Sequence, residues 1–481
     1  MARVGPVTIH DLPAEVISHA FSYLNTVQLI YAARVCRQWR DLGLEHPTFW
    51  KNLAFGRATS GMFALLKARM NQGRGRPCHL RVVIVGTHPL IIPVLIRELL
   101  PAIMPRALTL EITLDADYDQ ELSDILKQPA PKLVEFARCS QVPLVPEIFG
   151  TGTTSKLEIL RLVGAPLPEV TIPAIRSITT LSIHHYTPED TTFPPATLEQ
   201  LQHLTSLTFS SPRVELHTPL SANFIKLLTR LNLLEFYCPH SIVKSFIQAV
   251  PSSCLSAIRT VRVLFGGELG SDLLHGLLTP LRSPFHLAIQ RADTTIFSIS
   301  LQDERSGFVR TFVEPLPNYY CKPDGNEMAN SLFRNVEIAS QLSTVTVSVS
   351  VWPHLIPYLR NFSSVGTLIV EYDWLSDYAP RPQRLPAFPF PGIGSSGWSG
   401  LTTLVLQSRR DFIDVNALDV LAFLDLMIAQ RCKILELRRV RVIDKLDLLS
   451  ERFKSVVSFA ERLWPSEGQF TPGAVEWTRE M

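Results

Sequence analysis

The chain has 481 residues, of which 46% are hydrophobic and 19% are charged, and this composition is typical of a globular protein with two or three domains or one long array. Its net charge of +2 provides no strong attraction to nucleic acid or anionic lipid. Seven scattered cysteines indicate reduced thiols, and the sequence shows neither an apolar signal segment nor an uninterrupted bilayer-spanning stretch. We therefore expect a protein of the cytoplasm or nucleus that binds neither nucleic acid nor membrane.

Residues 11–50 have the spacing of three short amphipathic helices. We expect the first helix to begin at Pro13, because proline suits the first helical turn. Asn25 or Thr26 is expected to cap the second helix, and Trp39 belongs to the third. The helices carry more large apolar surface than they can bury among themselves, and no cysteine pair or metal cluster stabilises them. This pattern predicts a protein partner, and an N-terminal helical cap on the following residues is the alternative.

The order of motifs in this segment resembles an F-box, over about 45 of the 481 residues. The resemblance rests on Leu12-Pro13-x-Glu15, on Phe21-x-Tyr23-Leu24, on Ala32-Ala33-x-Val35-Cys36-Arg37-x-Trp39-Arg40 and on the trailing Trp50. In that family the module docks the Skp adaptor of cullin–RING ubiquitin ligases, so the resemblance implies these partners. Carried over residue by residue, it implies adaptor contacts from Leu12, Pro13, Val16, Leu24, Leu29, Val35, Cys36 and Trp39. The segment from His46 to Trp50 also resembles fungal F-box proteins.

A six-residue phrase recurs after these helices: an apolar residue, two others, an apolar residue, one other and an apolar residue. Its copies begin at Leu80, Ala107, Leu133, Leu157, Ile178, Leu204, Leu231, Ile258, Leu342, Val365, Leu401 and Cys432. The first eight copies step by 21 to 27 residues, and such a step is typical of leucine-rich repeats. The predicted fold class is therefore α/β: a three-helix F-box, then an irregular leucine-rich-repeat-like solenoid with parallel strands on the concave face and helices on the convex face.

Three features depart from a regular repeat. The asparagine or cysteine that usually follows each strand is absent. The spacing fails between Pro284 and Leu342, where residues 296–301 and 308–313 look like a strand pair. A proline-rich segment, 379–399, is expected to be a projecting loop, with a polyproline ligand as the alternative. A second interpretation thus stays open, in which ordinary α/β units have this spacing by chance.

These patterns divide the chain into five consecutive parts. They are an F-box (8–55), a linker helix (56–78), the solenoid (79–443) with insertions at about 290–340 and 376–400, a capping helix (444–464) and a tail (465–481). The tail has the composition of a loose end, whereas the capping helix has an amphipathic pattern that would cover the last repeat.

The residue between the last two apolar residues of each phrase is expected to face the concave side. These residues are Ile84, Glu111, Ala137, Arg161, Ser182, Thr208, Glu235, Arg262, Thr346, Ile369, Val405 and Glu436. No charge sign dominates among them, so the sequence does not name the target. The candidate target-binding residues are Arg161, Thr208, Glu235, Arg262 and Glu436.

Motifs for catalysis, cofactors and metals fail when their context is considered. Gly392-x-Gly394-x-x-Gly397 matches the dinucleotide fingerprint, but a proline-rich loop precedes it instead of a strand. His184 and His185 are adjacent residues of a predicted strand and point to opposite faces, so they are not a metal-binding pair. The sequence also lacks a zinc cross-brace for ubiquitin transfer. We therefore expect no catalytic residue, no metal and no cofactor.

The sequence thus predicts a non-catalytic subunit that places an unidentified protein substrate near the active site of another enzyme. The Skp adaptor would bind the F-box, and the substrate would bind the repeat array. Two other classes stay open: a scaffold that uses the array without ligase activity, and an enzyme whose site the sequence does not reveal. Recovery of cullin with the chain discriminates the receptor from the scaffold.

Overall fold

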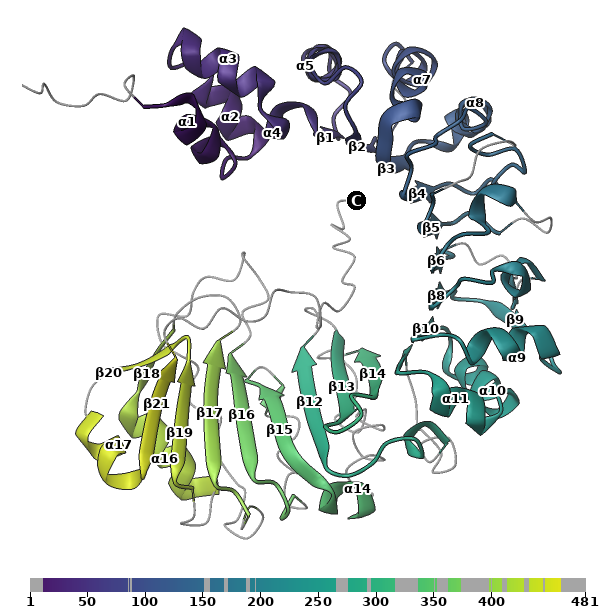
Figure 1. The fold of residues 1–481 in the computed structure, drawn as a ribbon. Coiled ribbons are helices and arrows are strands. Elements are labelled where there is room, and N and C mark those ends of the chain that lie inside the picture. Colours follow the sequence, from purple (N-terminus) through teal and green to yellow (C-terminus); the bar gives the residue numbers. More distant parts are fainter. Residues whose placement is uncertain are drawn as a thin grey trace, which may run out of the picture. The chain divides into compact units, whose positions relative to one another are not determined.

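The computed structural model describes residues 12–84, 86, 89–150, 156–167, 172–186, 191–194, 196–264, 276–291, 296–315, 336–349, 351–352, 362–372, 398, 400–408, 413–427, 432–443 and 446–459. The chain divides into unit 1, Met1–His217 with Ser221–Leu227, and unit 2, Thr218–Leu220 with Leu228–Met481. N-terminal helices precede open, parallel-rich sheet (Figure 1), so the predicted α/β class is confirmed. None of the described helices combines the length and apolarity that crossing a bilayer requires.

Unit 1 begins with four short helices and continues as strands joined by helices or turns. Its α-helices are α1 (Ala14–Phe21), α2 (Thr26–Ala32), α3 (Arg37–Glu45), α4 (Pro47–Trp50), α5 (Ser60–Gln72), α6 (Ile92–Val94), α7 (Leu100–Ile103) and α8 (Asp119–Ile125), and most of α9 (Ala222–Leu228). Its other helical turns are η2 (Leu95–Leu99), η3 (Met104–Arg106), η4 (Ala116–Tyr118), η5 (Pro173–Ile175) and η6 (Ala196–Gln200). The predicted linker helix over 56–78 thus corresponds to α5.

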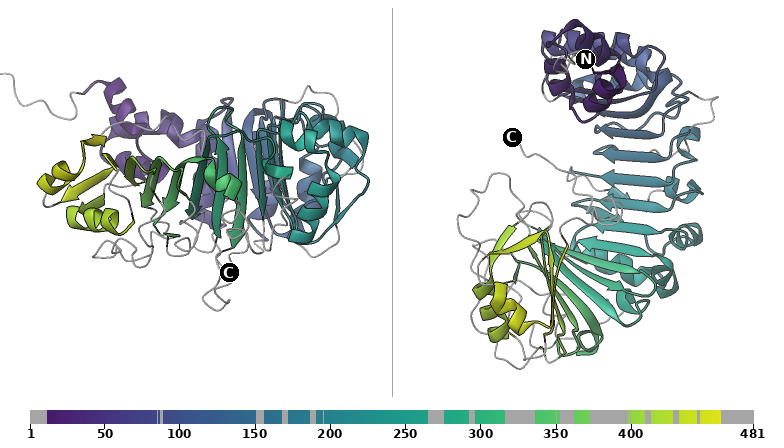
Figure 2. Two further views of the ribbon diagram at one scale, coloured as in Figure 1. Left: turned by 90° about the horizontal axis from the view of Figure 1, so that it is seen from below. Right: turned by 60° about the vertical axis from the view of Figure 1, so that its left-hand side comes forward.

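Seven strands of unit 1 form one parallel sheet, in chain order (Figure 2). They are β1 (Asn52–Phe55), β2 (Cys78–Val83), β3 (Ala107–Thr113), β4 (Glu135–Cys139), β5 (Ile159–Val163), β6 (Thr180–His184) and β8 (Ser206–Ser210), and β7 (Thr191–Phe193) pairs separately with β9 (Val214–Leu216). Leu160, Leu181 and Leu207 are register partners and are fully buried. The recurring phrase therefore marks strands whose apolar residues share one face.

Helices cover one face of this sheet, but not along its whole length. The helices α5, α7 and α8 lie on the same side of the strands in Figure 1. Where the structure describes the connections that end in β6 and β8, they contain η5 and η6 instead of α-helices. Pro166 and Pro173 in the first connection, and Pro194 in the second, disfavour a longer helix because proline lacks the backbone N–H. The predicted helical layer is therefore partly replaced by short turns.

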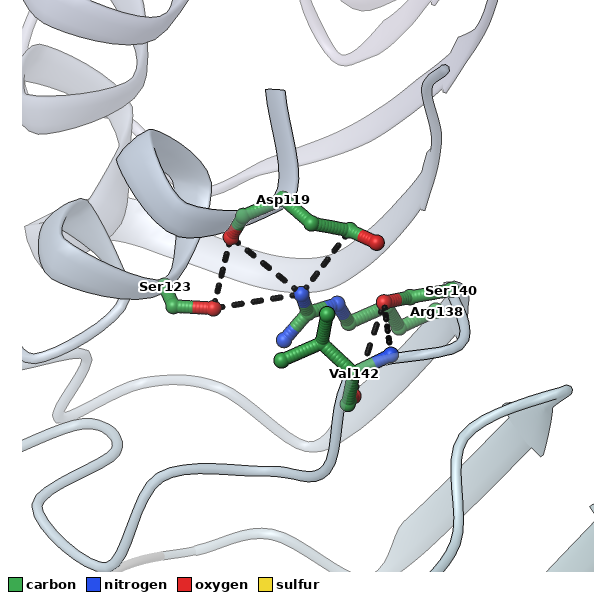
Figure 3. Close-up of polar contacts among 5 residues, drawn as sticks. All are labelled: Asp119, Ser123, Arg138, Ser140 and Val142. Atoms are coloured by element: carbon green, nitrogen blue, oxygen red, sulfur yellow. Dashed lines mark hydrogen bonds and ion pairs between the residues drawn. The ribbon is translucent and has the colours of Figure 1, made fainter. Parts of the chain in front are cut away.

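A buried ion pair joins α8 to the sheet. Figure 3 shows Arg138 of β4 reaching Asp119 and Ser123 of α8. The Nη2 atom of Arg138 donates to the Asp119 carboxylate at 3.0 Å and to the Ser123 hydroxyl at 3.2 Å. The Arg138 side chain is completely buried, so the carboxylate compensates a charge that water cannot reach.

Unit 2 contains a mixed sheet with ten described strands. They are β10 (Leu233–Tyr237), β11 (Thr260–Leu264), β12 (Phe285–Arg291), β13 (Ile296–Asp303), β14 (Val309–Pro315), β15 (Leu342–Ser348), β16 (Thr367–Tyr372), β17 (Thr403–Ser408), β19 (Ile434–Arg438) and β21 (Ser455–Phe459). A separate parallel pair is formed by β18 (Ile413–Asn416) and β20 (Val440–Ile443). The described helices are α10 (His240–Ala249), α11 (Ser252–Ala257), α14 (Val336–Ser340), α16 (Ala417–Met427) and α17 (Leu446–Arg452).

An antiparallel strand interrupts the parallel sheet of unit 2. The strand order there is β11-β14-β13-β12-β15, with β13 antiparallel to both of its neighbours. The predicted strand pair over residues 296–301 and 308–313 is confirmed as β13 and β14. The strand β12, which starts at Phe285, also lies in the region between Pro284 and Leu342 where the repeat spacing fails.

The end of the chain differs from the predicted capping helix over 444–464. Helix α17 ends at Arg452, and Ser455–Phe459 forms β21, which pairs in parallel with β19. Pairing with an available sheet edge thus overrides the helical spacing of the sequence. The predicted tail, 465–481, and most of the proline-rich insertion, 376–397, lie outside the described residues.

Candidate partner-binding site

The first four helices share a small apolar core of their own. Ile17 and Phe21 of α1, Leu29 of α2 and Phe49 of α4 are buried together. Trp39 of α3 packs against this cluster, with its ring edge-on to Phe21 at 5.5 Å. A capping box fixes the start of α2: the Gln28 backbone N–H donates to the Asn25 side chain, and the Asn25 backbone N–H donates to the Gln28 side-chain oxygen.

The structure divides the eight predicted adaptor contacts by exposure. Pro13 is exposed, and Val16 and Val35 are 49% and 59% exposed. Leu12, Leu24 and Trp39 are partly buried against the core, and Cys36 is partly buried where its Sγ accepts from the Trp39 backbone at 3.4 Å. Leu29 is only 1% exposed, so it belongs to the core of the helices instead of the surface.

Three further large side chains are exposed in this segment. Tyr23, Val27 and Tyr31 are 76%, 59% and 62% exposed. Val27, Tyr31 and Val35 follow one another at four-residue spacing along and just beyond α2. Val16 and Tyr23 are seven residues apart along and just beyond α1, so they share a helical face. We call these five residues, Val16, Tyr23, Val27, Tyr31 and Val35, the apolar stripes.

The apolar stripes have the composition of a protein-binding surface. A single exposed apolar residue needs no explanation, whereas five large ones within 20 consecutive positions favour an interaction surface. Tyrosine supplies both an apolar ring and a hydroxyl, which suits it to interfaces. A four-residue spacing in the sequence is the signal that could have identified Val27 and Tyr31.

Arg69 fastens these helices to the rest of unit 1. It lies on α5 and is 4% exposed. Its guanidinium donates to the carbonyl of Phe49 in α4, to that of Asn52 in β1 at 2.6 Å and to the Thr26 hydroxyl at 3.3 Å. Burial lowers the pKa of Arg69 to about 10. The helices and the sheet are therefore joined by one cation that serves three elements.

The predicted target-binding residues occupy mid-strand positions, each between two buried apolar residues. In unit 1, Arg161 is exposed and pairs with the Glu135 carboxylate of β4, and Thr208 is half-buried on β8. Its position on β5 also places Arg161 in register with Ser182 of β6. The mid-strand positions of β5, β6 and β8 are therefore polar and at least partly exposed.

In unit 2 the mid-strand positions are more enclosed. Glu235 is 8% exposed and accepts from Arg262 at 2.6 Å, while Glu436 pairs with Arg438 at 2.8 Å. Thr346 and Val405, which were expected to face a target, are 3% and 1% exposed. The Thr346 hydroxyl is hydrogen-bonded to the His286 ring at 2.8 Å, so that side chain already has a partner within the chain.

One predicted mid-strand residue is placed wrongly. Ile84 is 2% exposed, and the register pairs Leu80 with Leu110 and Val82 with Ile112. Arg81 therefore takes the mid-strand position of β2, and it pairs with Glu111 at 3.0 Å. The prediction is therefore offset by three residues, and an offset by an odd number of residues places each side chain on the opposite face of the strand.

The adjacent residues His184 and His185 have different surroundings. His185 is buried, with its ring edge-on to Phe209 at 5.9 Å, and burial lowers its pKa. The ring of His184 is instead hydrogen-bonded to the Ser182 hydroxyl at 2.8 Å. Across the described part of the chain, no three His, Cys, Asp or Glu side chains gather to hold a metal ion.

Comparison with known proteins adds one finding. A family model described as F-box-like matches residues 9–56, which include α1 to α4 and β1. A search of curated proteins finds no match to the chain. The chain therefore carries an F-box-like domain at the helices that display the apolar stripes.

Proposed function

We propose that this chain is the substrate-recognition subunit of a Skp–cullin–F-box ubiquitin ligase. The observation that carries the proposal is the coincidence of the F-box-like match with the apolar stripes. F-box domains typically bind the Skp adaptor, and an adaptor that covers Val16, Tyr31 and Val35 would remove exposed apolar area from water.

The strand array is the proposed site for the target protein. Its in-register parallel strands and the steps between them support the leucine-rich-repeat-like interpretation. The strands of unit 1 offer both charges, through Arg81 and Glu111 at mid-strand positions and through mid-strand Arg161 with Glu135 at the start of β4. Mixed charges of this kind favour selection of a complementary partner more than raw affinity.

The proposed role needs no catalytic group on this chain. A target held on the array would meet the conjugating enzyme at an effective concentration far above its free one, on the order of millimolar for a short tether. Rate enhancement would then come from proximity at another protein's active site. The free cysteines of the described residues suit a reducing compartment such as the cytoplasm or nucleus.

The test is co-purification of the adaptor and cullin with the V16E/V35E variant. Both side chains are about half exposed, so the added carboxylates are expected to leave the fold intact while charging the interface. Adaptor recovery is expected to fall about tenfold or more.

The matched control is V142E/V456E, which adds the same charge at valines that are 36% and 38% exposed and lie outside the F-box-like domain. The control is expected to retain the adaptor. Equal recovery from both double variants contradicts the proposal. Recovery of adaptor without cullin from the wild type would instead support a scaffold that acts outside a ligase.

A further inference from the structure

A cavity of about 390 Å³ lies in unit 1, where the ends of α5 and η3 meet the residues before β4. Met70 and Arg106 are buried lining residues, at 5% and 8% exposure. Arg74 and Lys132 are exposed at its rim. Its volume lies in the range of typical small-molecule sites, and it is open to solvent, because its other lining residues are exposed.

The cavity is lined by positive charge alone. Arg74, Arg106 and Lys132 contribute three cations, and none of the lining residues has a carboxylate. None of these three side chains forms an ion pair with another of the described residues. An anion in the cavity would therefore be attracted to three cations that no ion pair neutralises within the described part of the chain.

Arg106 is held in place before any ligand arrives. Its Nη1 donates to the carbonyl of Gly73, and its Nη2 donates to that of Met70 at 3.1 Å. A guanidinium has five N–H donors, so these two bonds leave donors for a ligand. Preorganisation of this kind lowers the entropy lost on binding.

We propose that this cavity binds a small organic phosphate. Arginine presents a planar fork that matches phosphoryl oxygens, and lysine adds a point charge. Three cations favour a ligand with two or more negative charges over a single carboxylate. Met70, Ala102 and Pro105 provide an apolar wall for the organic part.

The cavity also adjoins the attachment of the F-box-like domain. The Arg106 partner Gly73 packs so tightly on Trp50 that an added Cβ would lie 3.0 Å from the Trp50 Cβ. The Arg76 guanidinium lies 5.0 Å from the centre of the Trp50 ring. An anion bound at Arg106 is therefore expected to stabilise the segment that supports Trp50, in addition to filling the cavity.

The test uses the full chain and titration calorimetry with inorganic pyrophosphate at constant ionic strength. The wild type is expected to bind one equivalent, and R74Q/K132Q is expected to bind at least tenfold more weakly. The control R282Q/K433Q removes the same charge at exposed residues of unit 2 and is expected to bind within twofold of the wild type. Absence of saturable binding by the wild type, or equal weakening by both double variants, overturns the proposal.

Two further titrations identify the source of the phosphoryl group. Glucose 6-phosphate represents a small organic phosphate, and a phosphoserine peptide represents a modified protein. Binding of the sugar phosphate that R74Q/K132Q weakens supports the proposal, and binding of the peptide alone overturns it. Adaptor recovery is expected to be unchanged in R74Q/K132Q, so failure here is distinguishable from failure of the proposed function.

Discussion

Arg138 and Asp119 depend on each other because neither charge reaches water. The Arg138 side chain is 0% exposed and the Asp119 side chain 5% exposed, and they lie 3.0 Å apart. The Nε and Nη1 atoms of Arg138 have no hydrogen-bond partner among the described residues. The single carboxylate therefore carries most of the compensation for this buried guanidinium.

Asp119→Ala is expected to lower the free energy of unfolding by about 3–5 kcal/mol, because it leaves the Arg138 charge buried and unpaired. Urea denaturation followed by circular dichroism measures the loss. The double variant D119A/R138M is expected to regain part of it, since the buried charge is gone. As a control, Asp414→Ala breaks an exposed pair with Arg441 and should shift the midpoint much less. A D119A midpoint equal to that of D414A contradicts this account.

At the scale of elements, α5 is the piece that connects the F-box-like helices to the sheet. Through Arg69 it contacts α2, α4 and β1, and through Leu65 it contacts the core of the helices. The F-box-like domain and the strands from β1 to β8 accordingly belong to the same compact unit. The sequence assigned α5 to a linker, but its contacts are those of a structural element.

Arg69→Met is expected to loosen the helices without unfolding the sheet. Methionine replaces the aliphatic stem of arginine with an unbranched side chain, but it lacks the guanidinium. The carbonyls of Phe49 and Asn52 therefore lose this donor. Hydrogen exchange should then quicken in α1 to α4 by about tenfold, while β3 to β6 keep wild-type protection. Lys67→Met, on the exposed face of the same helix α5, serves as the control. Unchanged exchange in α1 to α4 contradicts the role given to Arg69.

Strands were easier to predict than surfaces because a strand's pattern is local. The phrase found β5, β6 and β8, since each places two buried residues two positions apart. Helix α2, in contrast, has an inner stripe that includes Leu29 and an outer stripe that includes Val27 and Tyr31. Both stripes are apolar, so the sequence cannot tell which one is buried. Only packing against Phe21 and Phe49 decides it.

Long-range pairing explains the other differences. The segment Ser455–Phe459 has a spacing that also fits a helix, and its parallel pairing with β19 makes it a strand. The offset at Ile84 likewise follows from the pairing of β2 with β3. The fungal-type resemblance and the binding of a target by the array stay predictions, because the geometry of the described residues tests neither.

At the scale of the whole molecule, four buried or half-buried histidines link stability to pH. Burial lowers the pKa of His46, His79, His185 and His286. The unfolded chain takes up protons near pH 6.5, before these folded histidines do. Their contribution is therefore fully present above about pH 6.5 and is lost as pH falls through that value toward the folded pKa.

The unfolding temperature is accordingly expected to decrease between pH 7.5 and pH 5.5. Differential scanning calorimetry at constant ionic strength measures the change. His286→Gln removes one of the four groups, and it should flatten the pH dependence while the amide can still bond to Thr346. An unfolding temperature that is constant or rises on acidification would rule out this linkage.

The inserted strand β13 has a consequence for how stability spreads through unit 2. Along most of the sheet, each strand is supported by the next strand in the chain, so order can propagate step by step. This order breaks at β11, which pairs with β14 and not with the next strand in the chain. The strands β13 and β12 follow on the other side of β14. Cooperativity between the two halves of that sheet must pass through β13. A destabilising substitution in β13 should therefore split one thermal unfolding transition into two. A substitution of equal cost in the terminal strand β21 should disorder only that edge of the sheet.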